Sequence, residues 1–485
     1  MRQDLLMGID VGSTSVRSAV YDIKGRLLSI ASCGTEKTMD ENGFSETALL
    51  QAVISNCNEA LEKVEGDFHL YGIAVACIGC GTMLVNKNGK LVHTKGDYHS
   101  IAKKFYEQTD SHDVFNITGY VPNEGTIAFR LAAHTGEEIE TVLSYADYVA
   151  FRLTGEKRRE YSTACSMGTW DNHNGRWWDK LFDFTGVDRA KFGTVENSGT
   201  LVGTVLPEIV ARSRIPQGTL VFTGGHDYLT SAFAAGCDSD KTILNITGTF
   251  EIMASFYDKP WQRAADNTDP IRPIIDNHVV PGKFSFQTES YGAGQTEWLR
   301  KKIFGVDDKG WGDLFAQLEQ HKNDRPSTEL FIPHVFGQLV PEVNMDAKGS
   351  YLGLTYRTDR VSLLKATIEG LCYQAREMLE AQKKVAAPDF VLRMVGGGTK
   401  SQTWLQAKAD ILNIPIHVPN IKEATALGAA MLAGVGAGVY ESYDDAMKTI
   451  QKLGEMVYTP RKNIVEAYDK IYHTRYKKII EILQD

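Results

Sequence analysis

Short apolar runs alternate with amphipathic stretches along most of this chain. Residues 5–22 read as two strands joined by a turn at Gly12–Ser15, and the apolar run at 70–76 reads as a buried strand. Apolar residues at helical spacing predict helices over 48–64 and 143–155. The first half of the chain therefore reads as a mixture of strands and helices.

The same alternation continues through the second half of the chain. Its predicted elements are helices over 361–384, 402–412, 423–438 and 463–485, and strands over 390–395 and 416–419. The last of these helices is amphipathic and strongly charged, and we expect it to form a solvated cover.

The hairpin pattern at the start of the chain recurs at residues 243–258. Gly12 to Asp22 and Gly248 to Asp258 span the same number of positions (22 − 12 = 258 − 248). Each stretch follows an apolar strand, turns at glycine with Ser or Thr, and ends in Tyr-Asp. The repeat predicts two domains of the same topology, although two unrelated hairpins can match by chance.

Length and composition agree with two globular domains. A chain of 485 residues is too long for one compact core, and we place the domains at 1–242 and 243–485. The hydrophobic and charged fractions, 43% and 23%, are those of an ordinary globular protein. The formal net charge of −9 argues against nucleic acid or an anionic membrane as the main partner. A nucleotide remains compatible, because it needs only a local set of N–H groups.

Cysteine usage and the N-terminus indicate a reducing compartment. The seven cysteines are scattered, and Cys77 and Cys80 form a CxxC spacing inside a strand pattern without a second pair. The N-terminus has no signal-peptide pattern, and the longest nearly apolar run, 72–85, is too short to span a bilayer. We expect a cytoplasmic protein without a membrane or nucleic-acid partner, and a homodimer by default.

Asp227 is the strongest candidate for catalysis. It follows an apolar strand and Gly224-Gly225, and it precedes a helical pattern, which would place it at the carboxyl end of a strand. Open α/β sheets bind ligands at that edge. A carboxylate there can accept a proton from a substrate hydroxyl. Taken alone, the pattern fits a helix N-cap at least as well.

Two glycine turns are suited to bind phosphate. In Gly12–Ser15 the backbone N–H groups and hydroxyls can contact a phosphate, and Asp10 before it could ligate Mg²⁺ directly or through water. In Gly396–Lys400 three glycines lie between a strand and a helix N-terminus, which favours an anion. A polar hairpin and a tight strand-to-helix turn are the alternative interpretations.

Four turns of this kind follow apolar strands in a fixed order, namely Gly12–Ser15, Gly224–Asp227, Thr247–Thr249 and Gly396–Thr399. This arrangement resembles the FGGY family of carbohydrate kinases, over essentially the whole chain. Further stretches that carry the resemblance are Tyr161-Ser-Thr-Ala, Trp178-Asp, residues 349–380 and Glu423-Ala-Thr-Ala-Leu-Gly-Ala-Ala.

The resemblance implies an α/β fold of two ribonuclease H-like domains, of the actin and hexokinase type, with ATP and Mg²⁺ in the cleft between them. It places Asp227 at the position of the catalytic base and Asp10 at the metal-linked acidic position. The implied nucleotide-binding residues are Gly12, Ser13, Thr14, Arg17, Thr247, Gly248, Thr249, Gly397, Gly398 and Gln402.

The sugar-binding positions depart from the family pattern. Polar side chains usual in the family are replaced by Gly79-Cys80-Gly81, and a Trp-x-Asp-x-Arg pattern survives only around Asp97. The candidate substrate contacts are Cys80, Gly81, Asp97, His226 and Asp227. Transferring the specificity of glycerol or xylulose kinases is therefore unsafe, and the expected substrate is a small sugar, a ketose such as xylulose or a related ketose or polyol.

Two other functions of the same fold class compete with the kinase. One is an actin-like or chaperone-type ATPase, and the other is a sugar-sensing regulator without catalysis. The Gly-Gly-His-Asp motif, with Asp227 intact, favours the kinase.

Overall fold

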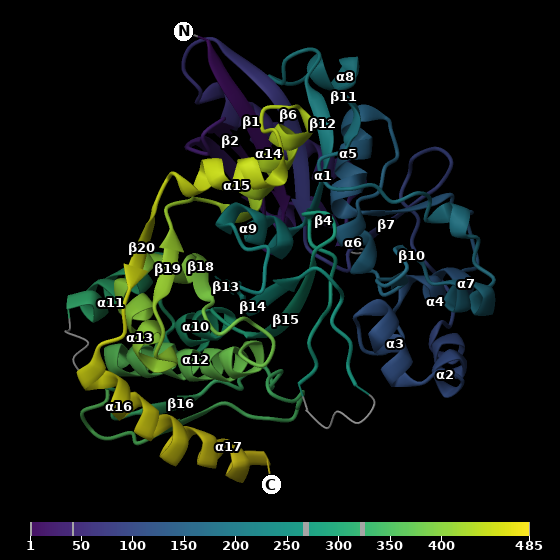
Figure 1. Cartoon of the computed structure of the whole chain (residues 1–485). Helices are drawn as coiled ribbons and strands as arrows, with labels where there is room; N and C mark the ends of the chain where they lie inside the picture. The colour runs from purple at the N-terminus through teal and green to yellow at the C-terminus, as the bar shows by residue number, and fades with distance from the viewer. Residues whose placement is uncertain (1, 41–42, 265–270, 321–324, 485) are drawn as a thin grey trace.

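The computed structural model describes residues 2–40, 43–264, 271–320 and 325–484. Two six-stranded sheets divide the molecule into two α/β domains (Figure 1). The first sheet consists, in spatial order, of β11 (Leu201–Thr204), β12 (Leu220–His226), β6 (Phe68–Cys77), β1 (Gln3–Val11), β2 (Ser15–Asp22) and β3 (Leu27–Gly34). The second consists of β15 (Phe284–Tyr291), β14 (Phe250–Tyr257), β13 (Thr242–Thr247), β18 (Val391–Gly396), β19 (Ile416–Pro419) and β20 (Glu455–Tyr458).

The two sheets have the same topology. In the first, β1 pairs antiparallel with β2 and parallel with β6, which in turn runs parallel to β12. In the second, β13 pairs antiparallel with β14 and parallel with β18, which runs parallel to β19. The predicted hairpin repeat and the two-domain fold are thereby confirmed. The boundary at residues 242 and 243 stays a prediction.

Helices from both halves of the chain cover the first sheet. Helices α1 (Glu46–Glu62) and α5 (Tyr145–Thr154) pack on strands of this sheet, while α14 (Ala424–Gly436) packs on β1, β6 and β12 (Figure 1). The contact of α14 is so close that a Cβ on Gly8 would lie 1.7 Å from the carbonyl oxygen of Ala426. Helix α9 (Asp227–Ala235) contacts α14 and strands of both sheets. This region therefore joins the two domains.

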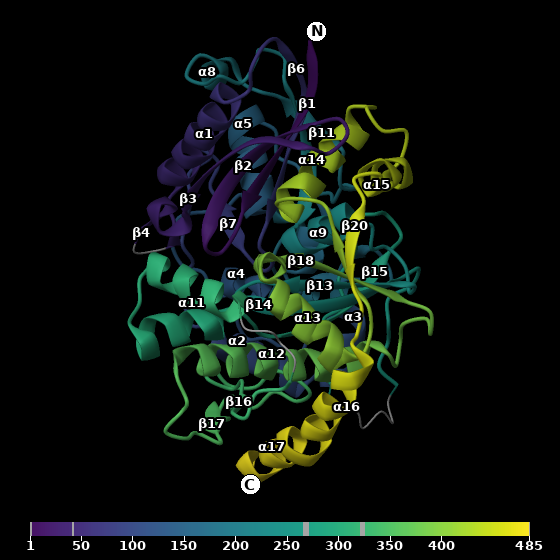
Figure 2. The same ribbon diagram turned by 90° about the vertical axis from the view of Figure 1, so that its left-hand side faces the viewer.

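The second sheet is covered by α12 (Arg360–Gln382), with α13 (Gln402–Leu412) beside it (Figure 2). The C-terminal segment forms α16 (Lys462–Ile471), a π-helical turn over Tyr472–Tyr476 and α17 (Lys477–Gln484). The helical structure of this segment was predicted, but the prediction that it is a solvated cover is wrong for one of its faces. There, Tyr468, Tyr472 and Tyr476 are fully buried and approach the ring of Tyr373.

The helix expected over 143–155 begins later than its apolar pattern suggests. Residues 143 and 144 end the short strand β8 (Thr141–Ser144), and Ser144 then caps α5 in a capping box with Asp147. Gly155 ends this helix in the left-handed region with φ 79°.

The remaining described elements complete both domains. In the first domain they are β4 (Met39–Asp40), β5 (Gly43–Phe44), β7 (Thr82–Val85), α2 (His99–Glu107), α3 (Ser111–Thr118), α4 (Ile127–Ala132), α6 (Tyr161–Cys165), β9 (Trp170–Asp171), β10 (Arg176–Trp177), α7 (Asp179–Thr185) and α8 (Pro207–Val210). In the second they are α10 (Gly294–Trp298), α11 (Asp308–Gln320), β16 (Leu330–Ile332) and β17 (Ser350–Leu352), whereas α15 (Tyr443–Gln451) packs on α9 and α14 beside the first sheet. Within the described ranges, no helix has the length and apolar character that a membrane crossing requires.

Candidate active site

Asp227 lies where the sequence predicted it, at the carboxyl end of a central strand. Strand β12 ends at His226, and α9 begins at Asp227. Gly224 is required there, because a Cβ would lie 1.8 Å from the carbonyl oxygen of Val75 on β6. The N-cap of α9 is His226, so the N-cap interpretation of Asp227 is wrong. Its carboxylate accepts a hydrogen bond from the backbone N–H of Tyr228 at 2.7 Å and remains partly exposed.

Asp10 faces Asp227 across the end of the same sheet. Asp10 lies near the end of β1 and Asp227 directly follows β12, and both strands run parallel to β6, so their carboxylates meet at one edge. Burial, followed by the charge of Asp227, raises the pKa of Asp10 to about 7, against the lowering effect of Arg17. Arg17 donates to Oδ2 of Asp10 at 3.1 Å, whereas the buried Oδ1 has no hydrogen-bond partner. Burial also raises the pKa of Asp227, and the nearby His226 opposes that rise.

The first expected phosphate turn borders this pair of carboxylates. Gly12, Ser13 and Thr14 join β1 to β2, and the side chains of Ser13 and Thr14 are exposed. The turn is held from behind, because Thr35 donates through its hydroxyl to the carbonyl of Gly12 at 2.8 Å and through its N–H to that of Thr14 at 3.1 Å. The hydroxyls of Ser13 and Thr14 are therefore open to a ligand, whereas the N–H of Gly12 donates to the carbonyl of Ser15 within the turn.

The second expected phosphate turn rests on a buried ion pair that the sequence did not reveal. Thr247 ends β13, and Gly248 and Thr249 lead into β14. Beneath them, the ammonium of Lys408 on α13 contacts Glu251 and donates to Asn245 at 2.9 Å and to the hydroxyl of Thr247 at 3.1 Å. The lysine and the glutamate are almost fully buried. The only signal in the sequence was a lysine among the apolar positions of the predicted helix.

The third glycine turn packs directly on the second phosphate turn. Gly396 ends β18 with φ 96°, and a Cβ on Gly398 would lie 2.6 Å from the side chain of Thr247. A short 3-10 turn, Gly397–Lys400, leads to Gln402, which is the exposed first residue of α13. The structure therefore brings together the residues expected to hold the phosphates and the adenosine.

The small residues at 79–81 make room for neighbouring rings. A Cβ on Gly79 would lie 2.3 Å from the ring of His226, and a Cβ on Gly81 would lie 2.2 Å from that of Tyr145. Cys80 between them is exposed and has φ 60°, which is uncommon for a residue with a side chain. Its N–H and thiol contact Ser166 at 3.1 and 3.0 Å.

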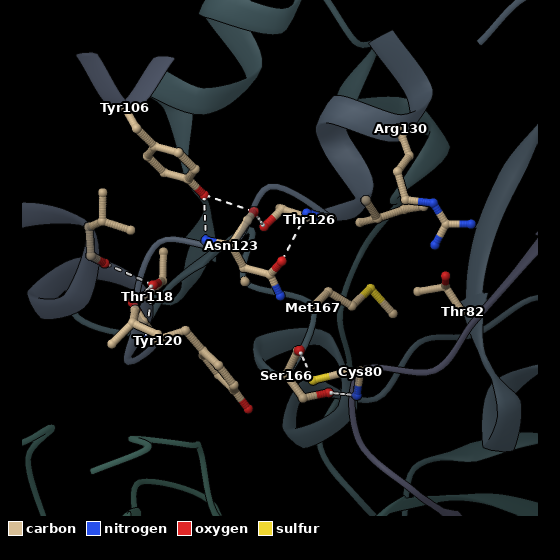
Figure 3. A pocket seen from close by; sticks show the side chains of 15 residues that line it. Cys80, Thr82, Tyr106, Thr118, Tyr120, Asn123, Thr126, Arg130, Ser166 and Met167 are labelled. Atoms are coloured by element: carbon tan, nitrogen blue, oxygen red, sulfur yellow. Dashed lines mark hydrogen bonds between the residues drawn. The ribbon is translucent and has the colours of Figure 1, made fainter. Parts of the chain in front are cut away.

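A cavity of about 100 Å³ opens beside Cys80 (Figure 3). Tyr106, Asn123 and Thr126 lie on one side of it in this view, and Arg130 and Thr82 lie on the other. Asp97 is not among its lining residues. The carboxylate of Asp97 instead binds the hydroxyl of Ser100 at 2.6 Å at the start of α2, where it is exposed. The cavity thus combines neutral polar groups and one cation, Arg130, with apolar side chains such as Val114, Ile127 and Met167.

The tryptophans of the first domain are packing residues. Trp170, Trp177 and Trp178 are all buried.

The cysteines, Cys77 and Cys80 included, are free, and no group of three or more metal-ligating side chains occurs in the described ranges.

Comparison with known proteins agrees with this geometry. The profile of the FGGY family of carbohydrate kinases, N-terminal domain, matches residues 5–234, and that of the C-terminal domain matches residues 261–437. The chain is 25% identical to a probable L-xylulose kinase from Pasteurella multocida, over 99% of both chains. It is also 25% identical to an autoinducer-2 kinase from Enterobacter sp., over 96% of this chain and 92% of that one.

The fold is that of solved sugar kinases. The ligand-bound xylulose kinase from Lactobacillus acidophilus superposes with a TM-score of 0.82 at 18% identity, over 99% of this chain and 98% of that one. With profiles of both domains matched along most of its length, the chain belongs to the FGGY family of carbohydrate kinases, phosphotransferases that use ATP and an alcohol acceptor.

Proposed function

We propose that this protein transfers the γ-phosphate of ATP to a hydroxyl of a small sugar, with Asp227 as the general base. The observation that carries the proposal is the pair of facing carboxylates, Asp10 and Asp227, at one edge of the first sheet beside the turn Gly12–Thr14. Asp227 is partly exposed, so a substrate hydroxyl can reach it. A well-placed base of this kind contributes about 10²–10⁴ in rate.

The remaining catalysis in this proposal is positioning and charge stabilisation. Phosphoryl transfer needs the acceptor and the γ-phosphate aligned, with the developing charge spread over donors. Ser13, Thr14 and Thr249, together with Arg17, supply such donors, whereas the N–H groups of Gly12 and Gly248 donate within their own turns. The glycine turn beside the second phosphate turn is assigned to the adenosine portion of ATP. Its residues are Gly397, Gly398 and, at the start of α13, Gln402.

The residues around Asp10 fit a divalent cation. Its buried Oδ1 lacks a partner, and a second carboxylate faces it. Mg²⁺ is usually held by one or two carboxylates together with phosphates and water rather than by a full set of protein ligands. Asp10 would hold Mg²⁺ in this way, and the cation would neutralise charge on the phosphates.

We infer that the acceptor is a ketose such as xylulose, or a related ketose or polyol. Support comes from the named activities of the relatives and from a small cavity that offers several hydroxyl and amide groups and one cation. Cys80, Gly81 and His226 lie on this side of the site and are proposed as contacts. Asp97, whose carboxylate accepts from the hydroxyl of Ser100, stays a prediction, as do the homodimer and the cytoplasmic location.

The test is ADP release in a coupled assay with Mg·ATP over a panel of small ketoses, polyols and aldonates. The wild type and Asp227→Ala are run in parallel, and nucleotide binding is measured for both. We expect a sugar-dependent rate that falls by about 10²-fold or more in the variant, with ATP binding retained.

Two results would overturn the proposal. Retention of more than about a tenth of the rate in Asp227→Ala would remove Asp227 as the base. A response independent of every sugar, with slow ATP hydrolysis that survives the substitution, would instead indicate an actin-like ATPase or a sugar-sensing protein.

A further inference from the structure

Asp276 belongs to the second half of the chain, yet its carboxylate is fully buried among side chains of the first half. Tyr120 donates to its Oδ1 at 2.7 Å, and Tyr228 donates to its Oδ2 at 2.9 Å. The backbone around Asp276 is anchored on both sides. Its carbonyl accepts from the N–H of Ser285 at 2.8 Å, and the preceding Ile275 donates to the carbonyl of Gly119 at 3.1 Å.

The imidazole of His226 lies between this buried carboxylate and the expected base. Its Nε2 is 3.5 Å from Oδ1 of Asp227, and its Nδ1 is 3.7 Å from Oδ2 of Asp276. Both separations are within ion-pair range. Nδ1 is buried and makes no hydrogen bond. A buried polar nitrogen without a hydrogen-bond partner is costly, and the nearby carboxylate is its natural counterpart.

The ring of His226 has little freedom to turn away from the two carboxylates. Tyr228 contacts it edge-to-face, with ring centroids 4.7 Å apart. On another side, Gly79 approaches so closely that a Cβ there would overlap the ring. The carboxylate of Asp276 is held as firmly, because two tyrosine hydroxyls fix its oxygens. The histidine and Asp276 therefore form a preorganised pair behind Asp227.

Three carboxylates surround this single imidazole. They are Asp227 on α9, Asp276 in the segment before β15, and Glu289 on β15, whose pKa is raised by burial and lowered by His226. His226 lowers the pKa values of both Asp227 and Glu289 against the raising effect of burial, and so favours the ionised form of Asp227 that a base requires.

We infer that Asp276 is a positioning residue for phosphoryl transfer. Its buried carboxylate holds the imidazole of His226, and His226 in turn orients the carboxylate of Asp227. The inference rests on the proposed role of Asp227. Because Asp276 and Asp227 come from different halves of the chain, the second domain thereby contributes directly to the setting of the base.

A purely structural role is the alternative, in which Asp276 serves only as an acceptor for Tyr120 and Tyr228. Two substitutions separate these roles. Asp276→Asn removes the charge opposite His226 and keeps an oxygen acceptor for only one of the two tyrosines. Tyr228→Phe removes one hydrogen bond to Asp276 but keeps the carboxylate opposite the imidazole.

The first measurement follows the His226 imidazole by NMR in protein labelled with ¹⁵N-histidine, with His226→Gln used to assign the signal. We expect the ring ¹⁵N chemical shifts of His226 to change in Asp276→Asn and to change much less in Tyr228→Phe, because only the first substitution removes the carboxylate opposite Nδ1. Equal shifts in the two variants, or no shift in Asp276→Asn, would overturn the inference. This measurement needs no substrate, so it stands apart from any failure of the proposed kinase activity.

The second measurement is a double-mutant cycle on kcat with a sugar found in the panel assay. We expect Asp276→Asn to lower kcat about tenfold when His226 is present and less than about twofold in the His226→Gln background, with KM for ATP unchanged. If Asp276→Asn lowered kcat by the same factor with and without His226, the proposed coupling between the two residues would be overturned. If the wild type phosphorylates no sugar, the proposed function fails, and the NMR result alone decides the pairing.

Discussion

The two hairpin turns of the expected nucleotide site share a backbone plan but differ in the charges that support them. Beside Gly12–Thr14 lies Asp10, a buried carboxylate with one oxygen bound by Arg17 and the other unpartnered. Beneath Thr247–Thr249 lies Lys408, a buried ammonium compensated by Glu251 and by neutral oxygens. The carboxylate beside the first turn therefore has one oxygen without a hydrogen-bond partner, whereas the ammonium beneath the second turn is neutralised by its own ion pair.

This difference indicates that the two copies of the hairpin have different roles: the first presents a charged group to the ligand, and the second is a rigid support. If the hairpins are aligned on Gly12 and Gly248, the position of Asp10 is taken by Ile246 in the second hairpin. Only the first turn thus presents a carboxylate toward the base. The second turn gains rigidity from its ion pair, which ties β13 to α13 and so to the glycine turn that precedes this helix. A buried charge without a full set of protein partners is expected where a bound ligand supplies the missing partner.

The largest effect is expected at the second turn. Lys408→Met leaves the carboxylate of Glu251 buried without its cation, which should cost about 3–5 kcal/mol of unfolding free energy in urea titrations. The double variant with Glu251→Gln removes both charges and should recover most of that loss. If the double variant were as unstable as the single one, the loss would come from packing rather than from the uncompensated charge.

At the first turn we expect a substitution to lower activity and to leave the fold intact. Asp10→Asn should lower kcat for sugar phosphorylation by about 10²–10³, because it removes a charge that faces the phosphates. Its fold should remain intact by circular dichroism. A rate within a few-fold of the wild type would show that the two turns do not differ as proposed.

The stability of the first turn should depend on pH. The pKa of Asp10 is raised from 3.8 to about 7 by burial, so the folded protein binds this proton more tightly than the unfolded chain does. The unfolding free energy of the wild type should therefore decrease as the pH rises from about 4 to about 7.

Asp10→Asn should remove this decrease and be the more stable protein at pH 8, by roughly 1–3 kcal/mol in metal-free buffer. Urea titrations of both proteins at several pH values measure the difference. A difference that stays constant with pH would contradict the raised pKa of Asp10.

The smallest effects are expected for the exposed hydroxyls of the first turn. Ser13→Ala and Thr14→Ala should each raise KM for ATP about 2- to 10-fold, as expected for the loss of one hydrogen bond. Stability should stay within about 0.5 kcal/mol of the wild type, because neither side chain is buried. A loss of stability as large as that of Lys408→Met would remove the contrast between the turns.

Much of the fold was predictable because its signals are local. The helix over 402–412 and the strand over 416–419 appear with the predicted bounds, and both hairpins turn where glycine occurs among Ser and Thr. The start of α5 was misplaced, because apolar spacing alone does not distinguish the end of a buried strand from the first turn of a helix.

The sequence by itself determined the order of elements, the duplicated hairpin and the place of Asp227, since hydrophobic periodicity and turn chemistry depend on neighbours a few positions apart. Tertiary structure alone decided that Lys408 lies beneath Thr247 and that Asp276 lies behind His226. It also decided that the three C-terminal tyrosines are buried. These contacts join residues far apart in the chain, and they form only when two sheets and their helices pack into one interior, where every buried charge must find a counterpart.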